Sequence, residues 1–225
     1  MILISAVSLS EQIIGWLPAL IRACGVTLAL TVLSVSAGLV LAVFFALGKI
    51  SSSFILRNVC SAYIFFFRGT PLMMQLFFVY FALPQIIPSL NIKNAFAAAF
   101  IAFTLNVTAY LAEIIRAAIL SIDKGQLEAS KALGLRYTQA MKLVIIPQAY
   151  RRMIPPICNE FVMVIKDTSL VYIIALMDLT TQTRKIHSSS ATTMVYLPAM
   201  VLYLIMTIFF TTIFNRLEKK LSVYE

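Results

Sequence analysis

Long stretches without a single charged side chain dominate this sequence. The first runs from Ala23 to Gly48, 26 consecutive residues without Asp, Glu, Lys or Arg. A helix of about 20 apolar residues crosses the hydrocarbon core of a bilayer, because each residue adds about 1.5 Å to its length. The sequence therefore predicts an all-α integral membrane protein rather than a soluble domain.

The composition excludes most other classes of protein. Hydrophobic residues make up 61% of the 225 residues and charged residues only 12%, whereas a soluble domain has about 45–50% and about 25%. So few charges cannot cover a globule with a polar surface, and the chain is too apolar to be disordered. The three cysteines are far apart in apolar stretches, so we expect neither a disulfide framework nor a metal site.

Polar interruptions divide the chain into five predicted spans within a single domain, residues 1–225. The second span contains Arg68 followed by Gly69-Thr70-Pro71, and glycine and proline there predict a kink or a broken helix. The spans are expected at about 23–48, 54–81, 94–119, 153–176 and 192–215.

Lysine and arginine are unevenly distributed between the two sides of these spans. Eleven of them lie near span ends on one side and only three on the other, namely Lys93, Arg184 and Lys185. Cytoplasmic loops are enriched in Lys and Arg, so the first side is predicted to be cytoplasmic. The N-terminus would then lie outside and the C-terminus in the cytoplasm. The net charge of +9 is thus attributed to topology, and no nucleic acid partner is expected.

One long polar segment, residues 121–152, separates the third and fourth predicted spans. Asp123 can cap a helix that begins near Gly125, and Gly134 can end it. A second helical stretch is expected to end before Pro147. A helix of two to three turns is marginal alone in water, so the first helix is expected to need a partner.

This segment resembles a motif of the permeases of bacterial ATP-binding-cassette (ABC) importers. That motif reads Glu-Ala-Ala, three residues, Gly, nine residues, Ile, one residue, Leu-Pro. The chain has Glu128-Ala129-Ser130, Gly134, Val144 and Ile146-Pro147 at the same spacing. The three departures, Ser130, Val144 and Ile146, are small changes in volume.

Three further motifs narrow the resemblance to permeases for polar amino acids. Such permeases carry Arg-Gly-Thr-Pro-Leu followed by Gln, then Ala-Tyr-x-Ala-Glu-Ile-x-Arg, then Lys-Asp-Thr-Ser-Leu. The chain matches them at Arg68–Leu72 with Gln75, at Ala109–Arg116 and at Lys166–Leu170. The likeness runs from about Thr27 to Leu221.

The resemblance implies a type I ABC importer permease fold in the bacterial inner membrane. It implies a transport subunit rather than an enzyme, working with an ABC ATPase dimer, a second permease copy and an extracytoplasmic substrate-binding protein. The helix in the polar segment would be the coupling helix that docks on the ATPase. The residues to which the resemblance gives this role are Gln126, Glu128, Ala129, Ser130, Gly134 and Pro147.

No cofactor is expected in this chain. It has no Gly-x-x-x-x-Gly-Lys-Ser/Thr loop for a nucleotide, so ATP and Mg²⁺ are assigned to the partner ATPase.

Ionisable residues within the predicted spans are candidates for a substrate site, because each costs roughly 2.5–3.5 kcal/mol on insertion scales. A zwitterionic amino acid needs an anion for its ammonium group and a donor for its carboxylate. Glu160 is suited to the first role and Arg68 to the second. Additional hydrogen bonds are expected from Thr70, Gln75 and Asn106.

The alternative for these charges is an internal network of salt bridges. Glu113 and Arg116 fit a helix ion pair at spacing i,i+3. Glu160 and Asp167, seven residues apart, share a helix face, but Lys166 and Asp167 fit a structural pair better because they are adjacent opposite charges.

Two rival functions stay open from the sequence alone. One is a gradient-driven amino acid carrier or channel, which would work without ATP. The other is a purely structural membrane subunit, which anchors an ATPase and does not itself handle substrate. The sequence leaves the identity of the transported amino acid open.

Overall fold

The computed structural model describes residues 9–90 and 92–221, and every regular element in them is helical. The predicted domain also includes residues 1–8, 91 and 222–225, which lie outside the described residues. The α-helices are α1 (Leu9–Lys49), α2 (Phe54–Gly69), α3 (Leu72–Phe77), α4 (Leu83–Ile86), α5 (Ala95–Leu120), α6 (Lys124–Ala132), α7 (Tyr137–Ala140), α8 (Ile146–Asp167), α9 (Leu179–Ser190) and α10 (Tyr196–Leu221).

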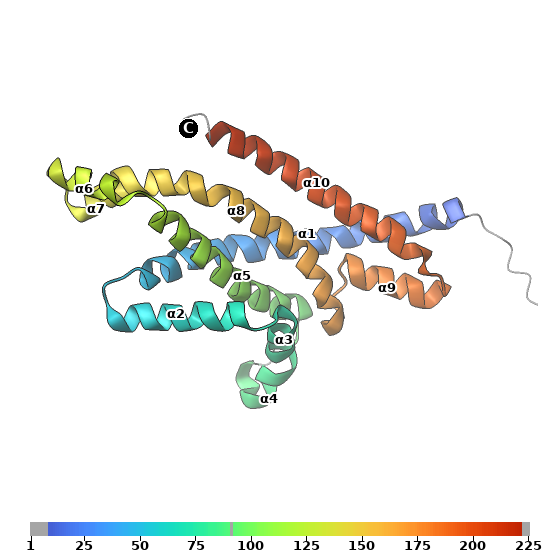
Figure 1. Cartoon of the computed structure of the whole chain (residues 1–225). Helices are drawn as coiled ribbons and strands as arrows, with labels where there is room; N and C mark the ends of the chain where they lie inside the picture. The colour runs from blue at the N-terminus through green and yellow to red at the C-terminus, as the bar shows by residue number, and fades with distance from the viewer. Residues whose placement is uncertain (1–8, 91, 222–225) are drawn as a thin grey trace, which may run out of the picture.

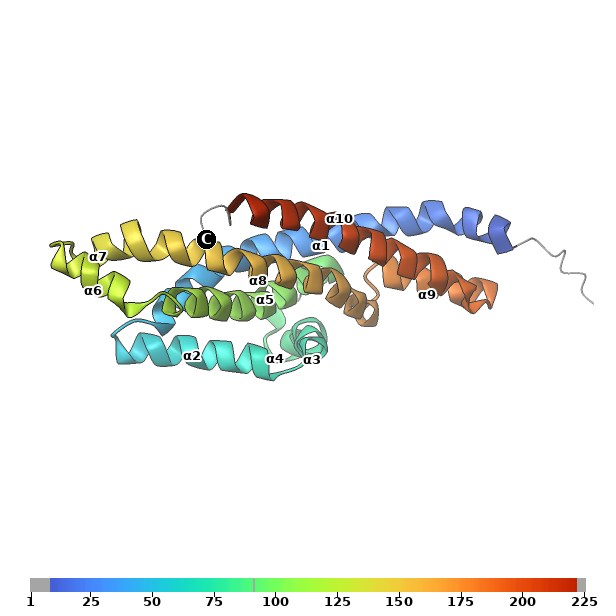
Figure 2. The ribbon, with the colours of Figure 1, turned by 45° about the horizontal axis from the view of Figure 1, so that its top comes forward.

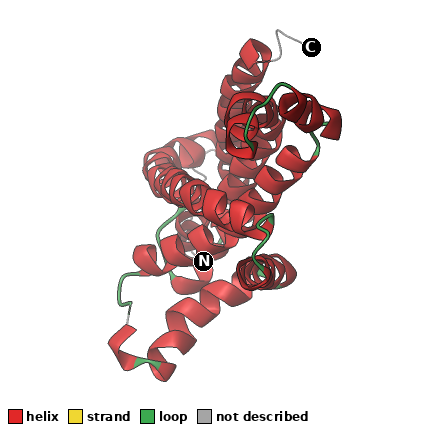
Figure 3. Cartoon of the chain, turned by 90° about the vertical axis from the view of Figure 1, so that its left-hand side faces the viewer, coloured by secondary structure: helices red, strands yellow, loops and turns green. Residues whose placement is uncertain are grey.

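Shorter helical turns join some of these elements. Two π-helical turns cover Phe78–Ala82 and Met141–Ile145, and three 3₁₀ turns cover Pro88–Leu90, Thr168–Ile174 and Thr193–Val195. Seen from one side, the described chain consists of packed helices and short loops (Figure 3).

The molecule is elongated along the direction of α1 (Figure 1). The short helices α6 and α7 lie at one end, and α9 lies at the other end beside the start of α1. The segment predicted to be cytoplasmic and the loop predicted to be external are therefore at opposite ends.

The packing of α1 against α5 forms the centre of the fold. A Cβ atom at Gly38 would lie 2.5 Å from Cγ1 of Val107, so only glycine allows this close approach. The hydroxyl of Thr108 donates to the carbonyl of Gly38 at 3.4 Å across the same contact. Small residues of this kind let membrane helices approach closely, because lipid supplies no hydrophobic force between them. On α5 the buried alanines are Ala98, Ala99, Ala102, Ala109, Ala112 and Ala118.

Large apolar side chains cover much of the outer surface. Val40 is 62% exposed, Phe65 81% and Met200 71%. A soluble monomer rarely exposes large contiguous apolar patches, whereas a bilayer solvates such side chains.

The described residues contain three helices long and apolar enough to cross a membrane. The bent pair α2 and α3–α4 adds a fourth if it counts as one span. The predicted fourth span corresponds to α8 and the 3₁₀ turn after it, which do not meet the same criterion. Its charged residues and two internal prolines, Pro155 and Pro156, account for this.

The first helix is longer than the predicted span 23–48, since α1 begins at Leu9. Arg22 ends the charge-free run but does not end the helix, because an exposed arginine is a good helix former.

The predicted break in the second span is present. Helix α2 ends at Gly69 and α3 begins at Leu72. The chain direction bends by 103° between Phe54–Gly69 and Leu72–Ile86. Figure 2 shows α3 nearly end-on where α2 runs across the page. Pro71 explains the break, because it has no N–H to continue the helix and restricts Thr70 to extended backbone.

The expectation that a helix ends before Pro147 is wrong. The chain stays helical through α7, the π turn Met141–Ile145 and α8. Pro147 lies in the first turn of α8, directly after the π turn, where the wider winding makes room for a residue that donates no backbone hydrogen bond.

Candidate functional site

The break between α2 and α3 is held by the side chain of Gln75. Its Nε2 donates to the carbonyls of Phe67 and Thr70 at 3.0 and 3.1 Å and contacts the Thr70 hydroxyl at 2.8 Å. Asn106 on α5 donates to Gln75 Oε1 at 2.9 Å and to the carbonyl of Phe67 at 3.2 Å. These bonds satisfy backbone groups that the break exposes.

A pocket of about 360 Å³ opens beside this break. Its lining comes from the end of α2, the start of α3, α5 and α8. The residues that line it are Arg68, Gly69, Thr70, Pro71, Leu72, Asn106, Tyr110, Glu160, Met163 and Asp167.

A second pocket, of about 370 Å³, shares Arg68, Tyr110, Glu160 and Met163 with the first. It continues along α5 and α8 past Ala117 and Pro156. Arg68 and Glu160 therefore lie where the two pockets meet.

The predicted substrate residues have different surroundings in the structure. Arg68, Glu160, Thr70 and Asn106 line the pocket, whereas Gln75 is 7% exposed and lines neither pocket. The guanidinium of Arg68 lies 5.3 Å from the ring centre of Tyr110. The sequence interpretation missed Tyr110 and Met163, and it placed Asp167 in a structural pair although Asp167 lines the pocket.

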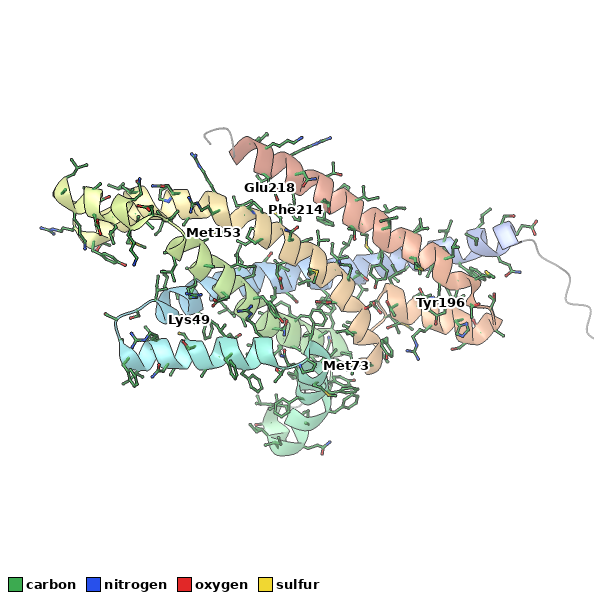
Figure 4. The ribbon with its side chains drawn as sticks, in the orientation of Figure 1. Lys49, Met73, Met153, Tyr196, Phe214 and Glu218 are labelled. Carbon is green, nitrogen blue, oxygen red and sulfur yellow. The ribbon has the colours of Figure 1, made fainter. Side chains whose placement is uncertain are left out.

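Glu113 and Arg116 form the expected ion pair, with Arg116 Nε 3.0 Å from both carboxylate oxygens. Lys49 at the end of α1 also reaches Glu113, at 2.9 Å, and sequence spacing cannot reveal that contact because 64 residues separate them. Figure 4 labels Lys49 at the end of α1 that lies toward α6 and α7.

Lys166 acts on Asp167 electrostatically, but the expected pair is not a salt bridge. Within residues 9–90 and 92–221, no salt bridge joins their side chains. Adjacent residues on a helix point about 100° apart, so Asp167 reaches the pocket while Lys166 stays exposed outside it.

The helix α6 has a well-formed start and end. The carboxylate of Asp123 accepts from the N–H of Gly125 at 2.7 Å, which caps the first turn. At the other end Gly134 has φ of +80°, and the N–H groups of Gly134 and Leu135 bond back to the carbonyls of Lys131 and Ser130. This pair of backbone hydrogen bonds is a Schellman motif. The motif favours glycine at position 134 because φ there is positive.

The motif residues of α6 divide between an exposed and a buried face. Gln126, Glu128 and Ala129 are exposed, whereas Ser130 is 4% exposed and donates to the Gln126 carbonyl at 2.6 Å. After α6, large apolar side chains point outward, with Leu133 82% exposed. The other large apolar residues exposed in this segment are Tyr137, Leu143, Ile146 and Tyr150.

Two side-chain contacts join the beginning of the segment 121–152 to its end, where α8 begins. Arg152 on α8 donates to the carbonyl and the hydroxyl of Ser121 at 2.6 and 3.1 Å. Gln148 Nε2 lies 3.3 Å from Gln126 Oε1, which links α8 to α6. The segment is therefore an ordered connection between α5 and α8.

Comparison with known sequences identifies related proteins over most of the chain. Residues 38–223 match the family described as binding-protein-dependent transport system inner membrane component. The glutamine transport system permease protein GlnP of Escherichia coli (strain K12) is 38% identical over 208 residues, which cover 92% of this chain and 94% of that protein. The L-cystine permease TcyB of Bacillus subtilis (strain 168) is 38% identical over 201 residues, covering 88% and 84% of the two chains.

Solved structures share the fold. A chain of an amino acid ABC transporter crystallised with histidines is 38% identical and superposes with a TM-score of 0.88, covering 93% of this chain and 97% of that one. A chain of the MetNI methionine ABC transporter, in an inward-facing conformation, has a TM-score of 0.76 at 20% identity, covering 91% and 96% of the two chains. The second comparison supports the fold alone.

Proposed function

The chain belongs to the family of binding-protein-dependent transport system inner membrane components, and from that membership we propose that it forms the translocation pathway of an ATP-driven importer of polar amino acids. Proteins of this family are multi-pass inner membrane proteins, and the apolar helices of this chain agree with that location. The relatives at 38% identity are permeases of glutamine and L-cystine transport systems, which supports amino acids as the substrate class.

The observation that carries the proposal is the structure of the segment 121–152. A capped helix presents Glu128 and Ala129 to the outside, followed by the exposed Leu133 and Tyr137. Exposed apolar side chains on a polar segment indicate a protein partner. In our proposal that partner is an ABC ATPase, present as a dimer, which binds ATP and Mg²⁺.

The same segment is continuous with the pocket. The helical run from Tyr137 to Asp167 connects α7 directly to Glu160 and Asp167 on α8. A movement of α6 and α7 on the ATPase surface would be transmitted along this run to the pocket. ATP binding and hydrolysis would then shift the population between inward- and outward-facing states, which substrate affinity alone cannot do.

The pocket is the proposed substrate site. Arg68 would bind the α-carboxylate as a guanidinium fork, and an acidic side chain of the pocket would bind the α-ammonium group. Thr70 and Asn106 line the pocket and would add hydrogen bonds. Gln75 would act indirectly, by holding the break that positions Arg68.

Further partners follow from the same proposal. A second permease copy, identical or a sister chain, would complete the pathway. A substrate-binding protein would deliver the amino acid at the end of the molecule where α9 lies.

A gradient-driven carrier or channel is the alternative function. It would need neither the ATPase nor the exposed surface of α6. Transport in proteoliposomes decides between the two, with this chain, its co-purified partners and the binding protein. We expect uptake of a labelled polar amino acid only with ATP inside; uptake driven by an ion gradient alone would overturn the proposal.

The coupling role of α6 can be tested with the substitution Glu128→Arg. We expect it to lower ATP-dependent uptake at least tenfold and to reduce co-purification of the ATPase, because it reverses a charge on the docking surface. Glu218→Arg, the same reversal on α10 outside the segment, is the matched control. Normal uptake and normal ATPase association in Glu128→Arg membranes would disprove the role.

A further inference from the structure

The pocket beside the helix break holds an excess of negative charge. Three charged side chains line it, namely Arg68, Glu160 and Asp167. Glu160 is within electrostatic range of both of the others. One cation therefore faces two anions.

None of these three groups is neutralised by a direct partner in the described part of the chain. There, Glu160 and Asp167 accept no hydrogen bond and form no salt bridge, and Arg68 is in contact only with the face of the Tyr110 ring. The other buried or half-buried acids of the membrane helices and their connections differ. Glu113 binds two cations, Lys49 and Arg116, and Asp178 caps α9.

Lys166, directly before Asp167 in the chain, acts on the Asp167 carboxylate electrostatically, but it does so from outside the pocket. Its side chain is exposed, lines neither pocket and forms no salt bridge within the described residues. The pocket therefore keeps two carboxylates for one guanidinium.

A zwitterionic amino acid satisfies only part of this arrangement. Its α-carboxylate neutralises Arg68 and its α-ammonium neutralises one carboxylate, so the second carboxylate stays unpaired. An unpaired charge at membrane depth is costly, whereas a second cation on the ligand would remove that cost. We propose that the pocket selects amino acids with a cationic side chain, such as lysine and arginine, an inference that rests on the proposed function.

The positions of the two carboxylates assign their roles. Asp167 lines only the pocket beside the break, together with Gly69 and Thr70, so it binds the α-ammonium group while Arg68 binds the α-carboxylate. Glu160 lies where the two pockets meet and binds the cation at the end of the side chain.

The spacing suits a long side chain. Asp167 lies seven positions after Glu160, which corresponds to about 10 Å along the helix. The four-carbon stem of lysine can bridge this distance between head group and terminal cation. Tyr110 and Met163 line both pockets at this point and offer an apolar surface to the stem.

The test measures binding to the permease without the binding protein, because the binding protein imposes its own selectivity on uptake. The chain is purified with its co-purifying ATPase, and the affinities for labelled lysine, arginine and glutamine are measured by equilibrium dialysis. We expect lysine and arginine to bind at least tenfold more tightly than glutamine, which has a similar length but no charge.

Substitutions distinguish selectivity from general damage. Glu160→Gln is expected to weaken lysine binding at least tenfold and to leave glutamine binding unchanged or stronger. Asp167→Asn is expected to weaken all three ligands, and Asp167→Glu is expected to restore part of the affinity. Lys185→Gln, which removes an exposed cation of α9 that lines neither pocket, is the control and is expected to bind like wild type.

Four outcomes would overturn the inference. They are glutamine binding as tight as lysine binding in wild type, an equal loss for all ligands in Glu160→Gln, Asp167→Asn with wild-type affinities, and no binding to the complex while ATP-driven uptake persists. In each case uptake of some amino acid with ATP would leave the proposed function standing. Absence of ATP-dependent uptake of every amino acid would instead reject the proposed function itself.

Discussion

At the scale of residues, polar side chains cap the first turn of several helices, namely Asn94 at α5, Asp123 at α6 and Asp178 at α9. Asp178 is fully buried and accepts from the N–H groups of Thr180 and Thr181 at 3.1 and 2.8 Å, which begins α9. The hydroxyl of Thr181 also donates to it, at 2.6 Å. Burial raises the pKa of the Asp178 carboxyl above its ordinary value of 3.8, and these hydrogen bonds oppose that rise.

This environment predicts different effects for two substitutions of Asp178. Asp178→Asn keeps the capping oxygen and is expected to preserve stability, whereas Asp178→Ala removes the cap and is expected to cost about 1 kcal/mol or more. Thermal unfolding in detergent measures both, and a chain of this size should lose roughly 2–4 °C per kcal/mol.

The pKa shift also sets the sign of a pH effect. The native state holds the Asp178 proton more tightly than the unfolded state, so it binds more protons in the window above pH 3.8. Wild type should therefore lose stability relative to Asp178→Asn as the pH rises through the native pKa. A wild-type advantage that grows with pH would contradict this account.

At the scale of elements, the break between α2 and α3 depends on one amide side chain. Gln75→Leu would remove the described side-chain donor to the carbonyl of Thr70 and the acceptor of Asn106, while the carbonyl of Phe67 would keep Asn106 as its donor. Buried unsatisfied groups cost about 1–3 kcal/mol. We expect a clear fall in thermal stability together with weaker substrate uptake, because Arg68 lies at this break.

Gln85→Leu is the matched control for Gln75→Leu. Gln85 lies on α4 of the same bent pair, is exposed, and donates only one bond that the structure describes, to the carbonyl of Phe81. Water can replace that bond, so little change is expected. Equal stability losses in the two variants would show that Gln75 has no special part in the break.

At the scale of the whole molecule, the five-span topology depends on α8. This helix is less apolar than α1, α5 and α10. Together with the 3₁₀ turn Thr168–Ile174 that follows it, α8 nevertheless connects the end of the molecule where α6 lies to the end where α9 lies (Figure 1). In a variant lacking native cysteines, Ser189→Cys is expected to react with an impermeant maleimide from outside spheroplasts. Lys131→Cys is expected to react only after permeabilisation.

Labelling of both positions from the same side would contradict the five-span topology. An even number of crossings would then separate α6 from α9, and α8 would not span the membrane. Lys131 and Ser189 are both exposed in the structure, so accessibility of the side chain itself does not limit either reaction.

The sequence by itself determined the features that depend on neighbours in the chain. Charge-free runs marked the long helices, Gly69-Thr70-Pro71 marked the break, and Asp123 and Gly134 marked the limits of α6. These follow from local backbone chemistry and from hydropathy, which need no knowledge of the fold. The resemblance of four motifs identified the family for the same reason, since motif spacing is a property of the chain.

Only the tertiary structure decided which distant groups meet. It joined Lys49 to Glu113 and Asn106 to Gln75, and it brought Asp167 into one pocket with Arg68. It also kept the chain helical through Pro147, where a local rule expected an end. Side-chain partners across helices depend on how the helices pack and rotate against each other, and periodicity within one helix does not specify its neighbour.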